Sequence, residues 1–411
     1  MRFVLASTFT WLDYSEHDRR QMLDAIKLLG ERQTRDELGL GGVRDAFADQ
    51  LFPGTSTIQT RAKYFLLVPW EYRTLELRRV PSAAVPNRAR KLEGDVMRAV
   101  GESDDATGLI GRRARENLQR LPSSVYWQGL LVWGIRVFAG SQEEYHQSLD
   151  HWYVHQNAHS RRRDDYDDDS AGVAVRHNWH TGLPPTPDPF PEGITLRLTR
   201  AEAEYLRERV LTSRPNSLLA NALQEELAVD ADHAWDLVGN VSTTLREVLG
   251  HARNFSEVML GAQLLYNLMI AELRGSRERV EEYQQLLEEW WQLLAKRRDE
   301  LQRWDRLRFW SIVYRGNPRI SPRAKLFVTR WTDIVQQKER LHDIVENSNV
   351  RGLIEMRETQ LKGGLSRLTG PRAKEQQWSG AAGAGQLNFR WPSARRIIMD
   401  IFEGLREGKD A

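Results

Sequence analysis

The segment from Glu278 to Trp304 contains neither glycine nor proline. Its large apolar residues recur at the spacing of one helix face: Leu286, Leu287, Trp290, Trp291, Leu293 and Leu294. The preceding stretch, Leu245 to Leu273, is also amphipathic, and Gly250 and Gly261 are its only weak points. The two stretches predict a pair of antiparallel helices with a shared core, so a mainly α fold is expected.

Helical periodicity extends into the N-terminal half. Met22, Ile26 and Leu29 fall on one face of a predicted first helix. A second helix is expected over residues 43–51, before Pro53 and Gly54. A third apolar segment, residues 58–68, is expected to stop at Pro69.

The middle of the chain has the composition of a loop. Residues 159–191 contain three consecutive arginines, an acidic run from Asp164 to Asp169 and five prolines. We therefore expect a helical N-terminal domain (1–191) that ends in this loop, and a long-helix C-terminal domain (192–411) that carries basic segments. Few short strands are expected. Residues 194–198 alternate apolar and polar as a strand would, and Thr199 is expected to cap the next helix.

Composition narrows the possible function classes. The 411 residues include no cysteine, which excludes disulfide scaffolds, thiolate zinc sites, iron–sulfur ligation and thiol catalysis. Lysine and arginine number 59 against 57 acidic residues, a net charge of +2. This balance argues against a generally basic nucleic-acid coat, so any role for charge must be local.

The sequence carries no motif of a known enzyme class. It contains no Walker-type loop, no Gly-x-Gly-x-x-Gly and no Gly-x-Ser-x-Gly elbow. We therefore expect no cofactor, and the absence of these motifs favours a protein that is not an enzyme. Early acidic residues argue against a signal peptide, and the apolar runs are too short for a membrane span, so a soluble cytoplasmic protein without membrane partners is expected.

Positive charge concentrates between residues 303 and 330. Eight cations there face one acid, Asp305, and tryptophans, phenylalanines and a tyrosine lie between them. Cations neutralise phosphates and aromatic faces stack bases, so this pattern indicates nucleic-acid binding. A helix with buried aromatics and a solvated basic face would have the same pattern. The candidate contacts are Arg303, Arg306, Arg308, Arg315, Arg319, Arg323, Lys325 and Arg330.

A second basic segment spans residues 351–374. Six cations there face only Glu355 and Glu358. Lys362-Gly363-Gly364 and Thr369-Gly370-Pro371-Arg372 bring backbone amides and cations together, as an anion-binding loop requires, although glycine pairs are also ordinary turns. The further candidate contacts are Arg357, Lys362, Arg367 and Arg372.

Two weaker patterns suggest other ligands. Six of the ten histidines lie between His146 and His180, and His151 and His155 share a helix face ahead of the acidic run. These residues offer an alternative, a metal-dependent hydrolase, although surface histidines beside a solvated loop explain them equally. Residues 53–57, Pro-Gly-Thr-Ser-Thr, precede Arg61 and Lys63 and suit either a phosphate at a helix start or a plain cap.

Several runs resemble an uncharacterised bacterial family of unknown function. The clearest is Arg44-Asp45-Ala46-Phe47-Ala48-Asp49, which continues through residues 51–61 to Pro69-Trp70. Further runs lie at residues 11–13, 35–39, 198–206, 261–267 and 357–363, so the likeness covers nearly the whole chain. The resemblance implies a place beside helicases and phospholipase-D-like nucleases in bacterial phage-defence islands. It implies no catalytic residues.

The leading hypothesis is an accessory protein of a bacterial DNA-processing or phage-defence system that binds nucleic acid through its basic segments. Its partners would be DNA or a DNA-processing protein such as a helicase or nuclease. The alternatives are the metal-dependent hydrolase of residues 146–180 and a structural subunit whose basic face binds an acidic protein.

Overall fold

The computed structural model describes residues 36–111, 120–165 and 177–407. The described residues form two compact units. Unit 1 contains residues 36–39, 261–289 and 339–385, and unit 2 contains residues 40–111, 120–165, 177–260, 290–338 and 386–407. The predicted domains, 1–191 and 192–411, are each one continuous segment, whereas these units combine separate segments. The predicted division near Pro191 stays a prediction.

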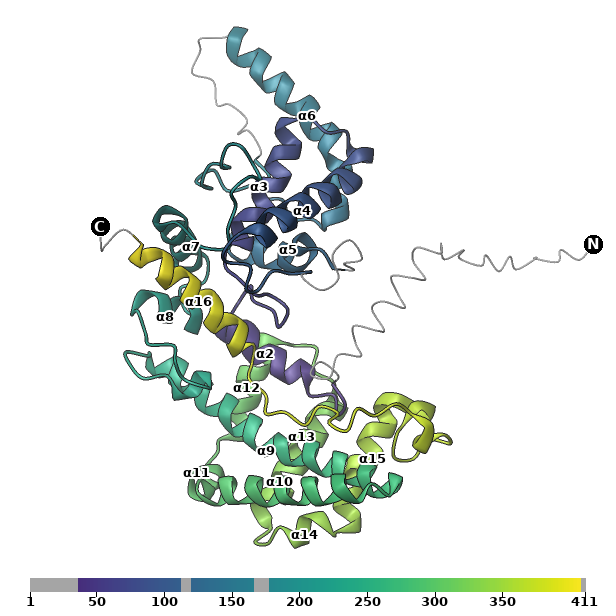
Figure 1. Ribbon diagram of the computed structural model, residues 1–411. Coiled ribbons are helices and arrows are strands. Elements are labelled where there is room, and N and C mark those ends of the chain that lie inside the picture. The colour runs from purple at the N-terminus through teal and green to yellow at the C-terminus, as the bar shows by residue number, and fades with distance from the viewer. Residues whose placement is uncertain (1–35, 112–119, 166–176, 408–411) are drawn as a thin grey trace, which may run out of the picture. The chain divides into compact units, whose positions relative to one another are not determined.

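The predicted mainly α fold is confirmed: the described residues form helices joined by turns (Figure 1). An isolated bridge joins Arg136 and Trp179. The helices that lie entirely in unit 2 are α2 (Gly41–Leu51), α3 (Tyr64–Leu77), α4 (Val85–Glu102), α5 (Pro122–Val132), α6 (Gln142–Asp165), α7 (Arg200–Ser213), α8 (Leu218–Gln224), α11 (Arg298–Gln302), α12 (Arg306–Gly316), α13 (Pro322–Gln337) and α16 (Trp391–Arg406). Unit 1 contains α14 (His342–Val345) and α15 (Ser348–Lys362). Both units contribute residues to α9 (Thr243–Arg274) and α10 (Arg277–Ala295).

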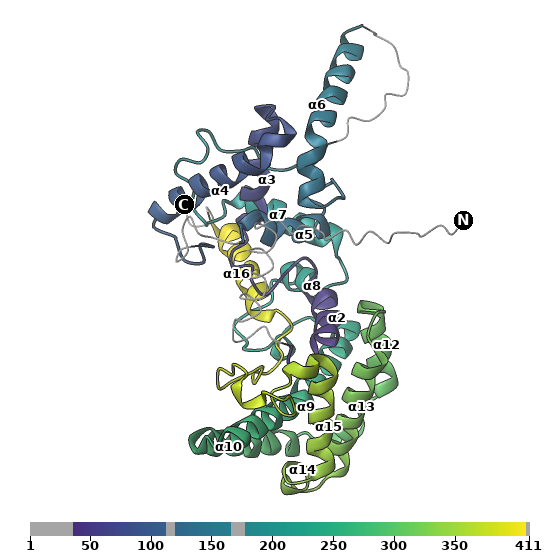
Figure 2. The same ribbon diagram turned by 90° about the vertical axis from the view of Figure 1, so that its right-hand side faces the viewer.

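The predicted antiparallel pair corresponds to α9 and α10, which run side by side in both ribbon views (Figures 1 and 2). Gly275 and Ser276 connect them, and Gly275 adopts φ +68°, a conformation that a side chain disfavours. The indole of Trp290 is buried and donates a hydrogen bond to the carbonyl of Glu257, at 2.8 Å. The two helices therefore share core contacts.

The helix of residues 278–304 is shorter than its composition suggests. It ends at Ala295, and α11 follows after a break at Arg297. The guanidinium of Arg297 pairs with the buried Glu257 and donates to Asn254 Oδ1 at 2.8 Å. These contacts of Arg297 hold the chain where α10 ends, a helix end that the local composition does not predict.

Pro69 does not stop the third apolar segment. The helix there, α3, begins at Tyr64 and continues through Pro69 to Leu77, so the expected stop is wrong. Proline lacks an N–H and its ring crowds the preceding turn, which usually kinks or ends a helix. Both Pro69 and Trp70 are buried, and packing against α4 and α5 holds the helix together.

The expected strand at residues 194–198 does not form. Ile194, Leu196 and Leu198 are buried, so the alternation reflects burial of one side of an extended segment that has no partner strand among the described residues. Thr199 does cap α7, in a capping box with Glu202. The predicted helix with Met22, Ile26 and Leu29 lies outside the described residues.

The core of unit 2 positions the surfaces described below. Helix α16 packs on α7 and α8, α2 packs on α12, and α3 packs on α4 and α5. Among the described residues, no helix is long and apolar enough to cross a membrane.

Candidate nucleic-acid interface

Two of the predicted cations on α12 are held by acids. Asp305 caps α12 by accepting a hydrogen bond from the backbone N–H of Arg308, at 2.9 Å. Arg308 then makes a bidentate ion pair with Glu247, with both N–O distances at 2.7 Å, and this lowers the pKa of the Glu247 carboxyl. Arg306 pairs with Asp333 on α13. Both guanidinium groups are therefore already paired.

Five other predicted arginines are exposed and make no ion pair with any acid that the structure describes. They are Arg303, Arg315, Arg319, Arg323 and Arg330. Arg303 donates only to the carbonyl of Asp299, at 3.0 Å. Arg323 and Arg330 lie seven residues apart on α13, which places them on the same face of the helix.

The aromatic residues between these cations are mainly core residues. Trp304 and Trp310 are each 7% exposed, and the Trp304 indole donates to His251 Nδ1 at 2.8 Å. Phe309 stacks on rings of α2 and α9. Lys325 lies over the Trp310 and Tyr314 rings, 5.5 and 5.3 Å from their centroids. The buried-aromatic interpretation of the pattern therefore applies to both tryptophans.

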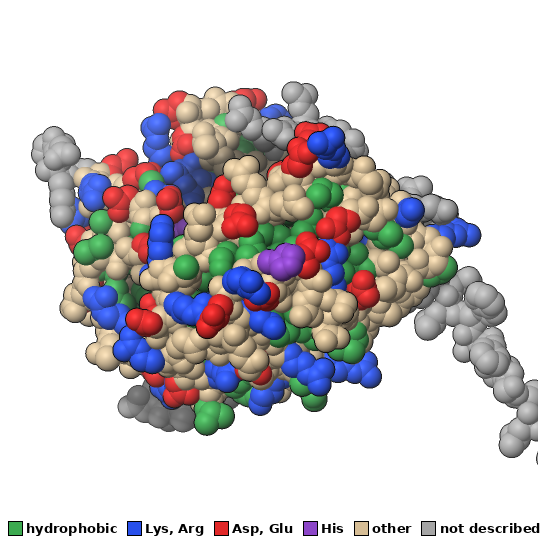
Figure 3. Space-filling view, turned by 90° about the horizontal axis from the view of Figure 1, so that it is seen from below, with side chains coloured by type: hydrophobic (Ala, Val, Ile, Leu, Met, Phe, Trp, Pro, Cys, Tyr) green, Lys and Arg blue, Asp and Glu red, His purple; other side chains and the backbone are tan. Residues whose placement is uncertain are grey.

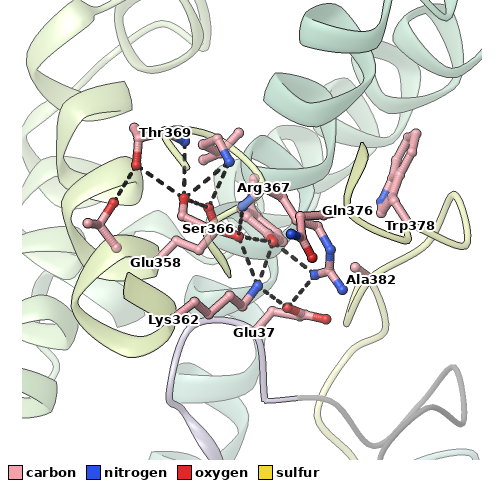
Figure 4. Close-up of polar contacts among 12 residues, drawn as sticks. Glu37, Glu358, Lys362, Ser366, Arg367, Thr369, Gln376, Trp378 and Ala382 are labelled. Atoms are coloured by element: carbon pink, nitrogen blue, oxygen red, sulfur yellow. Dashed lines mark hydrogen bonds and ion pairs between the residues drawn. The ribbon is translucent and has the colours of Figure 1, made fainter. Parts of the chain in front are cut away.

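In unit 1, two of the predicted cations pair with buried acids. Arg357 is buried and donates to the carbonyls of Leu38 and Gly39, at 2.8 and 3.1 Å. Lys362 pairs with Glu37 and Glu358, and the buried Arg367 also pairs with Glu37 (Figure 4). Arg372 is exposed.

The carboxylate of Glu358 is the centre of this cluster. It is fully buried and accepts hydrogen bonds from five donors (Figure 4). They are Tyr266 Oη at 2.6 Å, Ser366 Oγ at 2.7 Å, Lys362 Nζ at 2.9 Å, and the backbone N–H groups of Arg367 and Leu368, each at 3.0 Å. Burial acts to raise the pKa of Glu358, but these hydrogen bonds outweigh it and leave the pKa below its ordinary value.

The predicted anion-binding loop therefore holds an anion of the chain itself. Successive backbone amides after the glycine pair, together with Lys362, make the expected concave donor site. Glu358 occupies it from one turn earlier in the same helix. Binding of an external anion by this segment stays a prediction.

A large cleft lies within unit 2, with a volume of about 1310 Å³. The loop that follows α2 (residues 53–56), α5, the α7–α8 connection, the first turn of α9 and the last turn of α12 line it. Three arginines and one acid, Asp49, are among the lining residues. Sequence reasoning had not brought these segments together, because they lie up to about 340 positions apart in the chain.

Arg61 and Lys63 do not serve this cleft, although they follow residues 53–57. Arg61 is buried and pairs with Asp105 at 2.8 Å and with Asp400 at 3.0 Å. Lys63 pairs with Glu202 at 2.6 Å, and burial lowers the pKa of its amine. Both cations tie elements of unit 2 together, while Thr55 and Ser56 line the cleft.

Comparison with known proteins places the chain. Residues 6–404 match the model of a family described as "Family of unknown function (DUF6361)". The chain belongs to the DUF6361 family. The resemblance to a family of unknown function is thereby confirmed over nearly the whole chain. No curated protein and no solved structure matches it.

In this DUF6361 protein, two histidines of the predicted metal-binding pattern lie in contact with each other. His151 and His155 are exposed on α6, with their Nε2 atoms 2.8 Å apart. Asp164 to Asp169 lie outside the residues whose side chains the structure describes. Within the described part of the chain, no group of three or more His, Asp or Glu side chains has a metal-binding arrangement.

Sequence reasoning also missed an acidic pair in the core of the DUF6361 protein. Glu71 and Glu93 are buried, and Glu93 accepts hydrogen bonds from Ser123 N and Oγ, at 3.1 and 2.7 Å. Burial raises the pKa of Glu93 to about 7, and burial together with the Glu93 charge raises that of Glu71 well above its ordinary value. Glutamates on amphipathic helices usually face solvent, so the sequence carried no signal for this pair.

Proposed function

We propose that this protein binds nucleic acid through the exposed arginines of residues 303–330. The observation that carries the proposal is the set of five arginines without an acid partner among the described residues: Arg303, Arg315, Arg319, Arg323 and Arg330. A phosphate meets such a guanidinium without first breaking an ion pair, and its bidentate geometry suits phosphate oxygens.

The α13 face supports a backbone contact rather than base stacking. Arg323 and Arg330 are separated by seven residues, or roughly 10 Å along a helix axis. That equals the axial rise of about three base pairs for a helix that lies along a duplex. Trp304 and Trp310 are buried, so they supply no stacking surface. We therefore expect little sequence preference and a strong dependence on salt.

The other predicted cations are less available for a phosphate than the five exposed arginines. Arg306, Arg308, Arg357, Lys362 and Arg367 hold partners within the protein, so each would exchange an existing interaction for a phosphate. The exposed arginines need no such exchange. We therefore centre the proposed interface on α13 and the segment that precedes it.

The test is a charge reversal with a salt titration. Arg319→Glu, Arg323→Glu and Arg330→Glu are combined, and binding to single- and double-stranded DNA is measured by mobility shift at several salt concentrations. Loss of three phosphate contacts should weaken binding at moderate salt by at least tenfold. It should also make the slope of log affinity against log salt shallower by about 3.

The matched control reverses Arg78, Lys91 and Arg88, three exposed cations elsewhere in unit 2, to glutamate. It makes the same change in net charge, so affinity should stay near that of the unchanged protein. Equal losses in both variants would trace binding to net charge, and unchanged binding by the α13 variant would remove this interface. Failure of the unchanged protein to bind DNA would overturn the proposal and favour an acidic protein partner.

The proposal also includes the wider role implied by the resemblance, that of an accessory component beside a helicase or nuclease in a bacterial DNA-processing or phage-defence system. Its test is purification of the tagged chain from bacterial cells, with and without nuclease treatment. A helicase or nuclease that stays bound after nucleic acid is removed supports this role. A chain recovered without such a partner contradicts it.

A further inference from the structure

We infer that the cleft of unit 2 is a binding site for a ligand that carries a phosphate group, with Arg214 and Arg315 as its free cations. This inference stands on the cleft itself and does not require the proposed contact along α13. Only Arg315 belongs to both surfaces.

The floor of the cleft is rigid. The backbone of residues 53–56 packs directly on α5, because Gly129 has no side chain: a Cβ there would lie 2.4 Å from the carbonyl oxygen of Gly54. Gly54 itself has φ +82°, and the indole of Trp133 donates to the carbonyl of Pro53 at 2.9 Å. These contacts hold Thr55 and Ser56 at the cleft wall, so the site is formed before a ligand arrives.

The charge of the cleft is positive. Arg390 donates to Asp49 at 2.5 Å and to the carbonyl of Thr55 at 3.0 Å, so the one acid of the lining is engaged. The Arg214 side chain donates a hydrogen bond to the carbonyl of Val132, at 3.3 Å, and Arg315 makes no ion pair or hydrogen bond with an acid among the described residues, although its charge helps to lower the pKa of Glu247, which Arg308 already binds. Two guanidinium groups are thus left to bind an anion.

Neutral hydrogen-bonding groups complete the lining. The 32-residue helix α9 begins at the cleft, where Ser242 and Thr244 lie, and its N-terminus adds a partial positive charge to that of the arginines. The Ser56 hydroxyl is buried in the wall and has no hydrogen-bond partner among the described residues, so rotation of its side chain toward the cleft would give a phosphate oxygen a donor. Gln128 and Gln224 offer amides on the exposed side.

The size of the cleft selects among phosphate ligands. Its volume of about 1310 Å³ exceeds the roughly 300–1,000 Å³ of most small-ligand pockets. A free phosphate ion would fill little of it. A nucleotide or the phosphates of a nucleic-acid strand would fill more, and both present the same phosphate ester to the arginines. No aromatic side chain is among the described residues that line the cleft, so contacts to a base would come from the amides and from Leu245 and Val248.

The experiment measures calorimetric binding of three probes: inorganic phosphate, adenosine 5′-monophosphate and a ten-nucleotide single strand. Arg214→Gln with Arg315→Gln is the cleft variant, and Arg319→Gln with Arg323→Gln is its matched control. All four residues are exposed, so both variants should fold. We expect the cleft variant to bind the nucleotide at least tenfold more weakly than the unchanged protein, and the control to bind it equally well.

The two proposals fail separately. If the unchanged protein binds the nucleotide but not the strand, the cleft inference is supported and the proposed nucleic-acid binding is contradicted. Strand binding that only the control variant loses, with full affinity of the cleft variant for the nucleotide, does the reverse. The cleft inference is overturned if no probe binds the unchanged protein, or if the cleft variant keeps full affinity for every probe that binds.

A second measurement does not depend on substitutions. Phenylglyoxal modifies accessible arginines, and peptide mass spectrometry reports each position. A bound phosphate ester should protect Arg214 and Arg315 while Arg319 reacts at its usual rate. Equal reaction at all three positions, with the ligand at saturating concentration, contradicts the assignment.

Discussion

At the scale of single residues, buried carboxylates set the local chemistry of this protein. Glu358 in unit 1 is ionised and saturated with donors. Glu93 in unit 2 has two donors from Ser123 and a second buried acid, Glu71, as neighbour. The same residue type therefore has a lowered pKa in one place and a raised pKa in the other, because hydrogen bonds and charges differ.

Replacing Glu358 with glutamine should destabilise the protein by about 3 kcal/mol. The amide carries no charge to balance Lys362 and Arg367, and its NH₂ group is itself a donor, so some of the donors around it lose their acceptor. Equilibrium urea unfolding measures the change. Glu355→Gln, on the same helix but without an ion pair in the described structure, should cost less than about 0.5 kcal/mol. Equal stability of the two variants would contradict a central role for Glu358.

Glu93 should make stability fall as pH rises. Its folded pKa of about 7 lies above its ordinary value of 4.5, so the folded state binds more protons between these values. The stability gained from the neutral form is complete below pH 4.5 and is lost as pH rises toward 7. Glu93→Gln keeps the Ser123 contacts with a neutral group, so the slope of unfolding free energy against pH should flatten between pH 5 and 7. A slope identical to that of the unchanged protein would rule out this titration.

At the scale of elements, caps and close contacts position the helices. Thr199 Oγ1 accepts from Glu202 N, and the Glu202 carboxylate accepts from Thr199 N at 2.8 Å. Glu202 also binds Lys63 of the segment before α3. The capping box thus starts α7 and joins it to a second element of unit 2.

Thr199→Ala should cost about 1 kcal/mol, because it leaves helix N–H groups of the first turn without an acceptor. Thr212→Ala is the control: Thr212 is exposed within the same helix, and alanine is the better helix former, so a small gain in stability is expected there. Thermal unfolding of the two variants compares them. A melting temperature unaffected by Thr199→Ala would show that the box contributes nothing to stability.

Two glycines of unit 2 should respond in opposite directions to alanine. Gly129→Ala places a methyl group 2.4 Å from the Gly54 oxygen, so the cleft floor must shift at a cost of about 1–3 kcal/mol. Gly94→Ala meets open space within α4 and should stabilise the protein by roughly 0.5–1 kcal/mol. Denaturant midpoints report both changes. A neutral Gly129→Ala would mean that the floor is not tightly packed.

At the scale of the whole molecule, the net charge does not show which cations lack an ion pair. The face in Figure 3 shows basic and acidic side chains interspersed among apolar ones, in keeping with a net charge of +2. Of the eight cations counted between residues 303 and 330, Arg306 and Arg308 are paired and Lys325 lies over aromatic rings. Pairing, rather than the number of cations, decides what remains for a ligand.

The sequence by itself determined what depends on neighbours a few positions away. Helical periodicity and the Thr199 cap both arise from hydrogen bonds and side-chain spacing within one or two turns. The resemblance to a family of unknown function was also readable, because it rests on the order of residues, and the match to the DUF6361 family confirms it.

Tertiary structure alone decided what depends on distant pairs. Arg308 meets Glu247 across 61 positions, and Arg61 meets Asp400 across 339. The cleft likewise needs segments from residue 49 to residue 390, and helix α3 survives Pro69 because its neighbours bury it. Burial and ion pairing are properties of the packed chain, so counting charges along the sequence locates the basic segments but not the cations that stay free.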